Sequence, residues 1–299
     1  MHPIIAKENS SLRSRVLNLL KQGFSYPSRS SIIFVCGGNK EDHMRPKFIN
    51  YCKANAVDYL VFQPEYAIDH AHSLSDIPFN LSSFEKLIGE ISLAIVIFPE
   101  APGSYAEAGY FSAFKNLAEK SILVLDQRLI TNDSFLSIGP GKLISDKTRF
   151  HPSISMSYAE PDFDQIITRI KSRDGHRRSK GFPEGVYKNI SYFDKFCIIY
   201  RIFEILQKCS LDDVHYILKG LFWGRANLRE IQQISSVLLG AKILEENSDD
   251  GQFSISSVNA LNFRAKDGFN EERNSIKIEI VNLLTDSGQI AAMEPLNAA

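Results

Sequence analysis

Several features that would place the chain in a special class of protein are missing from its 299 residues. Its four cysteines form no CxxC pair and no dense disulfide framework, so a reducing cytoplasm is the simplest setting. No apolar run approaches the ~18–20 residues of a transmembrane helix, and the first residues lack the layout of a signal peptide. These absences predict a cytoplasmic, globular protein without a membrane partner.

A strong excess of charge is also missing, because the net charge is only -1. This value disfavours a protein whose whole surface binds nucleic acid. The charge is unevenly spread, however: residues 1–165 hold 16 Lys and Arg against 18 Asp and Glu, residues 166–190 hold 7 against 2, and residues 191–299 hold 11 against 15. The basic segment 169–180, followed by Gly and Pro, predicts an exposed linker over 169–190 or a contact with a nucleic-acid backbone.

The length is typical of about two domains, and the linker divides the chain into 1–168 and 191–299. The first part alternates short, continuous apolar runs with helical periods, a pattern typical of strands covered on both faces. It predicts an α/β domain with a doubly wound parallel sheet, and a leading helix over 9–23 packed outside that sheet. The predicted strands are 31–36, 58–62, 93–98 and 121–125, and the predicted helices are 45–56, 80–91 and 104–120.

The second part has a different pattern from residue 191 onward. Apolar residues at helical spacing predict three helices, over 193–206, 212–219 and 227–239. Two short segments, 241–246 and 252–256, flank a turn rich in Asn, Asp and Gly and predict a β-hairpin. Three helices followed by a hairpin favour a C-terminal winged helix-turn-helix domain.

Ligands of open α/β sheets bind beyond the carboxyl ends of the strands, at the switch point in strand order. Segments 36–39, 64–66 and 98–109 are expected to meet there. Gly103 and Ser104 begin a helix whose N–H groups could hold an anion or a sugar hydroxyl. Glu107 lies one turn further, is expected to stay ionised beside the helix dipole, and could attack an anomeric carbon. The alternative is that Glu107 is an ordinary helix charge and that Gly103 and Ser104 only cap the helix.

Other chemistries fit the sequence less well. The loop after the first strand contains neither GxGxxG nor a Walker lysine motif, so no dinucleotide cofactor fingerprint is present. Cys36 ends that strand and would need a nearby base to act as a nucleophile. His43 is only a neighbour in sequence, so we expect a buried, inert thiol. His70 and His72 lack a third ligand at sensible spacing, so no metal site is predicted.

Four segments carry a resemblance to a known family. They are residues 32–38 (IIFVCGG), Pro64-Glu65, residues 98–109 (FPEAPGSYAEAG) and residues 135–140 (FLSIGP). The first domain resembles the nucleoside 2-deoxyribosyltransferase-like fold, and more closely the toxin effectors of bacterial retrons. The likeness covers about half of the chain by motif and nearly all of it by layout. It departs at Glu100, where the transferases more often have Asp.

The resemblance implies that Glu107 attacks the anomeric carbon and displaces the base. It further implies that Glu100 holds sugar hydroxyls, while Gly37, Gly38 and Ser104 offer contacts to ribose and phosphate. Glu65 would bind a ribose or orient water. In the retron effectors the substrate would be NAD, so NAD enters as a substrate and no cofactor is expected.

The resemblance also implies partners: a retron reverse transcriptase and its multicopy single-stranded DNA–RNA hybrid, with a homo-oligomer left open. A winged helix that reads DNA normally has a basic face, yet only Arg225, Arg229 and Lys242 are available. The hairpin is instead acidic, with Glu245, Glu246, Asp249 and Asp250. This charge favours docking of the winged helix on a protein, and we expect the basic segment 169–180 to contact nucleic acid. The alternatives are a nucleoside or nucleotide transferase or hydrolase, and a winged-helix DNA-binding regulator with an α/β ligand-sensing domain.

Overall fold

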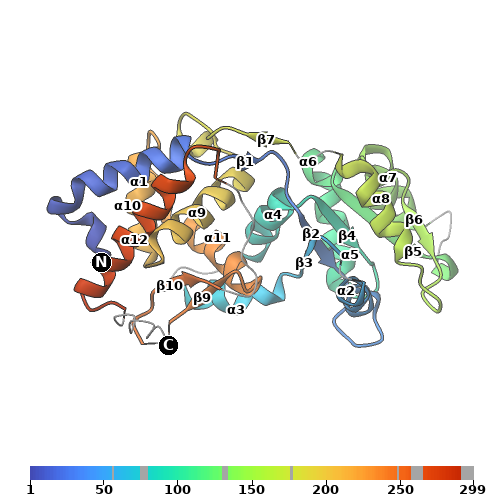
Figure 1. The fold of residues 1–299 in the computed structure, drawn as a ribbon. Helices are drawn as coiled ribbons and strands as arrows, with labels where there is room; N and C mark the ends of the chain where they lie inside the picture. Colours follow the sequence, from blue (N-terminus) through green and yellow to red (C-terminus); the bar gives the residue numbers. More distant parts are fainter. Residues whose placement is uncertain are drawn as a thin grey trace, which may run out of the picture. The chain divides into compact units, whose positions relative to one another are not determined.

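The computed structural model describes residues 1–55, 57–74, 80–129, 134–175, 178–247, 249–256 and 265–290 (Figure 1). The chain forms two compact units. The sheet unit consists of Arg29–Tyr66 and Asn80–Arg178, and the helical unit of Met1–Ser28, Ala67–Phe79 and Ser179–Ala299. The units therefore divide the chain differently from the ranges expected from the sequence, because the first 28 residues group with the C-terminal part.

The sheet unit is an α/β structure around five parallel strands in the order β3-β2-β4-β5-β6. The strands are β2 (Ile32–Cys36), β3 (Leu60–Phe62), β4 (Ala94–Ile97), β5 (Ser121–Asp126) and β6 (Ile154–Met156). The four predicted strands are confirmed. The fifth, β6, was not expected, because it has three residues and its central side chain is exposed, so it shows no continuous apolar run.

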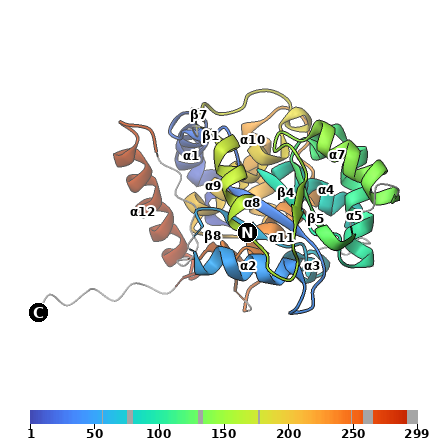
Figure 2. The same ribbon diagram turned by 90° about the vertical axis from the view of Figure 1, so that its right-hand side faces the viewer.

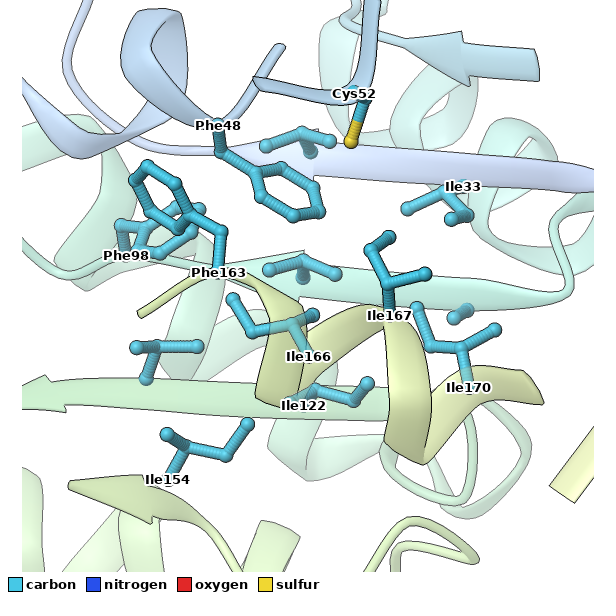
Figure 3. Packing of buried hydrophobic residues seen from close by; sticks show 14 of the residues in the cluster. Ile33, Phe48, Cys52, Phe98, Ile122, Ile154, Phe163, Ile166, Ile167 and Ile170 are labelled. Carbon is cyan, nitrogen blue, oxygen red and sulfur yellow. The ribbon is translucent and has the colours of Figure 1, made fainter. Parts of the chain in front are cut away.

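Helices cover both faces of this sheet, as a doubly wound arrangement requires. The helical segments are α2 (Met44–Ala54), α4 (Leu81–Ile91), α5 (Pro102–Ala113), α6 (Lys115–Ala118), η3 (Gln127–Leu129), η4 (Ser137–Gly141), α7 (Lys142–Lys147) and α8 (Asp164–Asp174). On one face, Phe48 and Cys52 of α2 and Ile167 of α8 pack with Ile33 and Ile122 of the strands (Figure 3). Helices α4, α5 and α7 lie together on the other side, as the turned view shows (Figure 2).

Two expected helices of the first part differ from the structure. The helix predicted over 104–120 is interrupted at Phe114, whose extended backbone separates α5 from α6. The leading helix, α1 (Ser10–Gln22), does not pack on the sheet; it contacts α9, α10 and α12 of the helical unit. Its buried face of Leu12, Val16 and Leu19 is an ordinary apolar stripe, which does not specify its partner.

The helical unit contains the three predicted helices and the predicted hairpin. Helices α9 (Tyr192–Leu206), α10 (Leu211–Leu221) and α11 (Leu228–Gly240) precede β9 (Leu244–Glu246) and β10 (Phe253–Ile255). With β8 (Lys208–Cys209), these strands form an antiparallel sheet in the order β8-β10-β9. The remaining segments are η1 (Pro3–Ile5), η2 (Lys7–Asn9), β1 (Tyr26–Pro27), α3 (Glu65–Ser73), β7 (Ser179–Lys180), η5 (Tyr187–Asn189) and α12 (Asn270–Asp286).

The predicted linker over 169–190 is only partly irregular. Helix α8 continues to Asp174 and ends at Gly175, whose φ of +62° is a conformation that glycine adopts readily. Strand β7 then pairs antiparallel with β1. Lys171 and Arg173 are exposed, whereas Lys180 forms an ion pair with Asp194 at 2.7 Å. His176 and Arg177 of this segment, like Ser248 of the hairpin turn, lie outside the described residues.

Candidate active site

The carboxyl ends of β2 and β4 mark the switch point of the sheet. The order β3-β2-β4-β5-β6 is the flavodoxin-like order, in which the crossover direction reverses between the first and third strands of the sheet, here β2 and β4. The loop after β2 carries Gly37 and Gly38, and the segment after β4 carries Glu100 and then helix α5 with Glu107. The topology therefore brings segments 36–39 and 98–109 to one edge of the sheet. The ion pair between Arg45 and Glu65 brings segment 64–66 to the same place.

Glu100 uses its carboxylate to hold the loop after β2. Its Oε1 accepts hydrogen bonds from the backbone N–H groups of Gly38, at 3.1 Å, and Arg45, at 3.2 Å. Its Oε2 accepts a third from Met44 N at 2.7 Å. Two of these donors belong to the first turn of α2, where backbone N–H groups have no acceptor within the helix. Glu100 thus fixes the start of α2, which is a positioning role, and its expected contact with sugar hydroxyls stays a prediction.

Ser104 and the two loop glycines are also engaged within the protein. The Ser104 hydroxyl is buried, accepts from the N–H groups of Glu100 and Ala101, and donates to the Ala101 carbonyl at 2.8 Å. The hydroxyl closes its own loop, and its expected contact with ribose or phosphate stays a prediction. Gly38 donates its N–H to Glu100 and accepts from Arg45 Nε at 3.2 Å. A Cβ on Gly37 would lie 2.8 Å from the Arg45 Cβ, so close backbone approach explains that glycine.

The backbone at the start of α5 is arranged differently. Pro102 is the first helical residue, so the N–H groups of Gly103 and Ser104 lie in the turn that lacks intrahelical acceptors. A Cβ added to Gly103 would meet no atom within 4 Å, and the same holds for Gly109. Gly103 therefore leaves the helix start accessible.

Glu107 is half-buried, and its carboxyl pKa is raised to about 7. Burial is the main cause, and the negative charge of Glu85 adds to it. Arg45 acts in the opposite direction, followed by smaller effects of Glu65 and of a hydrogen bond with Cys36. This pKa is higher than a helix dipole would give, so Glu107 is only partly ionised near neutral pH. Glu107 lies in the second turn of α5, whereas the dipole acts within the first turn.

Two residues of this cluster were not found from the sequence, Glu85 and Arg45. Glu85 lies on α4 beside the buried Phe84, and burial together with the charge of Glu65 raises its pKa to about 7. Arg45 is 3% exposed and pairs with Glu65 at 2.7 Å between Nη1 and Oε1. The only sequence signal for Glu85 was a carboxylate within the apolar stripe of its helix. This cluster of Glu65, Glu85, Glu107 and Arg45 is called the carboxylate cluster below.

Cys36 ends β2 directly beside the carboxylate cluster. It is fully buried, and burial followed by the charge of Glu107 raises its thiol pKa well above the ordinary value. A thiol that stays protonated is a poor nucleophile but can donate a hydrogen bond, which agrees with the expectation of an inert cysteine. His43 does not act on it: its Nδ1 accepts from the Lys40 N–H at 3.3 Å. Within the described residues, no three His, Cys, Asp or Glu side chains are grouped to hold a metal ion.

Comparison with known proteins identifies the family. A profile of the family described as STM3845 retron effector protein matches residues 41–246, which span β3 to β5 and the helices α9 to α11. The chain belongs to this family. The match includes Glu65, Glu85, Glu100 and Glu107, so the carboxylate cluster lies within the part of the chain that the family shares.

Two curated proteins of Escherichia coli are similar over part of their length. One, described as "Retron Ec86 putative ribosyltransferase/DNA-binding protein", is 33% identical over 129 residues, 42% of each chain. The other, "Retron Ec73 putative ribosyltransferase/DNA-binding protein", is 30% identical over 128 residues, 39% of each chain. The similarity thus spans less than half the length of these relatives. Among the described residues, no helix is both long and apolar enough to cross a membrane.

Three carboxylates and one arginine in a partly buried cluster suit reactions that develop positive charge. Both Glu85 and Glu107 have pKa values of about 7, so each is partly protonated and partly ionised near neutral pH. An ionised carboxylate can attack or stabilise an electron-deficient carbon, and a second can take a proton from water. Glycosyl transfer to water or to another acceptor uses both steps.

Proposed function

We propose that this retron effector is an N-glycosidase that splits the bond between nicotinamide and ribose in NAD. The observation that supports the proposal is the carboxylate cluster at the switch point, where open α/β sheets bind nucleotides. The nicotinamide ring of NAD is cationic, and a cluster of three carboxylates and one arginine attracts a cation. Because the ring departs as neutral nicotinamide, the leaving group needs no strong general acid.

The reaction would proceed at C1′ of the ribose attached to nicotinamide. The C1′–N bond breaks and its electron pair neutralises the ring, while positive charge develops on C1′ and the ring oxygen. The ionised carboxylate of Glu107 stabilises this charge or forms an ester with C1′. Water then supplies a hydroxyl to C1′, and its proton goes to a carboxylate of the cluster. NAD and water give nicotinamide, ADP-ribose and a proton.

Glu85 is our candidate for the group that takes the proton from water. Its pKa of about 7 lies close to the pH of the reaction, which is where a general base works best. Glu65 is exposed and its Oε1 is held by Arg45, so it would contact a ribose hydroxyl or orient the water. The N–H groups of Gly103 and Ser104 would donate hydrogen bonds to an anionic or hydroxyl oxygen of the substrate.

Membership of the retron effector family supports a proposal for the biological setting. We propose that the chain acts as a toxin that a retron reverse transcriptase and its multicopy single-stranded DNA–RNA hybrid hold inactive in the cytoplasm until phage infection. The three helices and hairpin of the helical unit have the element order of a winged helix, and we propose that they take part in this assembly. The names of the two Escherichia coli relatives, which include both a ribosyltransferase and a DNA-binding description, support an enzyme joined to a nucleic-acid partner.

The test is NAD cleavage by the purified full-length chain, followed by chromatography of nicotinamide and ADP-ribose. Glu107→Gln is expected to lower the rate roughly 1,000-fold or more, because Gln cannot supply the anionic oxygen. Glu160→Gln removes an exposed carboxylate of the same unit and serves as the matched control, with an unchanged rate. If the wild-type chain leaves NAD uncleaved both alone and with its retron partners, the proposal is contradicted.

A second candidate is transfer of the glycosyl group to another base, which the description of the two relatives as putative ribosyltransferases favours. The same Glu107 ester would form, and a nucleobase would replace water as the acceptor. Base exchange between nucleosides with NAD untouched would identify this activity. Both reactions require Glu107, so Glu107→Gln tests the cluster and the choice of substrate distinguishes the reactions.

A further inference from the structure

Trp223, the single tryptophan of the sequence, lies on the surface of the helical unit. Its side chain is 80% exposed, in the loop that joins α10 to α11. Exposing an indole forfeits the large apolar area that tryptophan buries when it packs in a core. A well-exposed tryptophan on an ordered loop is therefore a candidate contact for a partner molecule.

The side chains on either side of Trp223 anchor the loop. Phe222 is buried and stacks on Phe182, with ring centroids 5.0 Å apart and planes inclined by 22°. Ala226 is also buried, and its carbonyl oxygen lies 3.1 Å from His215 Nε2. The chain thus turns Phe222 and Ala226 inward and leaves Trp223 outside.

The backbone of Trp223 is fixed as well. Its N–H donates to the Gly185 carbonyl at 3.3 Å, and its own carbonyl accepts from the Tyr187 N–H at 3.0 Å. Gly224 follows with a φ of +83°, and a Cβ there would meet Val186 at 3.2 Å. A contact residue on a backbone held in this way loses little conformational entropy when a partner binds.

The charge around this loop is positive. The two adjoining stretches, residues 182–188 and 219–227, contain Lys188, Lys219 and Arg225, all exposed, and one acidic residue, Glu184. The rest of this part of the chain is acidic, since residues 191–299 hold 11 Lys and Arg against 15 Asp and Glu. Positive charge is thus concentrated in the two segments whose backbones pair at Trp223, in a part of the chain that is otherwise negative.

We infer that Trp223 is a stacking platform for an unpaired base of single-stranded DNA or RNA, with Lys188, Lys219 and Arg225 beside its phosphates. An exposed aromatic ring next to cations is the combination by which proteins bind single strands, because every base offers a flat face and every linkage a negative charge. A stacked duplex offers no free base face within its length. The site differs from the basic segment 169–180 expected from the sequence, and it does not depend on the chemistry proposed for Glu107.

The single tryptophan makes the inference directly measurable. Indole fluorescence of the full-length chain is recorded during titration with a 20-nucleotide single strand of mixed sequence, as DNA and as RNA, at low salt. We expect both strands to quench the fluorescence, with a weaker effect as salt rises. The same DNA as a duplex is expected to quench much less. Equal quenching by duplex and single strand, or none by either strand, overturns the inference.

Variants are compared by the anisotropy of a dye-labelled single strand. Trp223→Ala should weaken binding by about 5- to 150-fold, the range found when one stacking aromatic is removed. Trp223→Phe keeps a flat ring and should retain most of the affinity, while Phe135→Ala, an 81% exposed aromatic of the sheet unit, should change nothing. Unchanged binding in Trp223→Ala contradicts the inference. The rate of NAD cleavage by Trp223→Ala should equal that of the wild type. A failure of the strand-binding inference can therefore be distinguished from a failure of the proposed NAD cleavage, which Glu107→Gln tests.

Discussion

Glu100 and Glu107 lie seven residues apart in one motif, yet their carboxylates have different surroundings. Glu100 accepts three backbone N–H hydrogen bonds that hold the loop after β2 and the start of α2. Glu107 is half-buried near two other carboxylates, and burial and their charge raise its pKa to about 7. The Glu100 carboxylate thus has its hydrogen-bond donors within the protein, whereas the Glu107 carboxyl group has a pKa near neutrality.

The difference shows how the environment of a carboxylate, and not its place in a motif, decides its role. Backbone donors stabilise the charged form, whereas burial and like charge stabilise the neutral form. Catalytic sites often contain carboxyl groups of the second kind, with pKa values moved toward neutrality. The comparison therefore supports the proposal that Glu100 has a positioning role and that Glu107 and Glu85 carry out the chemistry.

After Glu107→Gln, the largest effect is expected from Glu85→Gln. If Glu85 accepts the proton of the attacking water, its loss should lower the rate of NAD cleavage about 100- to 10,000-fold. Glu90→Gln, on the same helix, removes a carboxylate that binds Asn116 Nδ2 at 3.0 Å and is the matched control. Steady-state kinetics at pH 7.5 measure both. A rate within twofold of wild type for Glu85→Gln would remove Glu85 from the mechanism.

Glu100→Gln should act mainly on stability. The two carboxylate oxygens of Glu100 accept from three N–H groups, whereas Gln offers only one accepting oxygen. Because at least one partly buried N–H group loses its acceptor, the free energy of unfolding should fall by about 1.5–3 kcal/mol. Denaturant unfolding at pH 7.5 measures this change. Glu41→Gln, an exposed carboxylate of the same loop, is the control. A variant of unchanged stability that has lost NAD binding would instead restore the sugar-holding role expected from the sequence.

A smaller effect of opposite sign is expected for the stability of Glu107→Gln. The folded pKa of about 7 lies above the ordinary value of 4.5, so ionisation destabilises the fold increasingly between pH 4.5 and 7. Gln stays neutral and avoids this loss. The variant should thus be about 1–2 kcal/mol more stable than wild type at pH 8 and equal to it at pH 4. Melting temperatures at both pH values test this, and a less stable variant at pH 8 would contradict it.

Much of this arrangement follows from local sequence patterns. The continuous apolar runs of β2 and β4 predicted the sheet, and Asn80 predicted the start of α4, where its side chain accepts from the Ser83 N–H at 2.9 Å. Glu107 was found because a distinctive motif surrounds it. Two patterns were incomplete. The apolar stripe of α1 predicted a helix but not the helices it packs against. Ser104 was recognised as a possible helix cap, but the pattern did not show which group its hydroxyl would bind.

The carboxylate cluster itself could not be predicted, because it is assembled from four separate segments. Arg45 comes from α2, Glu65 is the first residue of α3, and Glu85 and Glu107 come from α4 and α5. The strand order of the sheet unit brings these four residues together. The pKa of Glu107 depends on burial and on neighbours more than twenty residues away in sequence. A local argument from the helix dipole therefore gave too high an ionised fraction for Glu107 near neutral pH.

The most direct test is an NMR titration of the Glu107 carboxyl carbon in protein labelled with ¹³C-glutamate, assigned by comparison with Glu107→Gln. The account predicts a midpoint near pH 7 that falls when Glu85→Gln removes the neighbouring negative charge. A midpoint near the ordinary value of 4.5, unaffected by Glu85→Gln, would show that the carboxylates are neither buried nor coupled and would contradict the proposed active site.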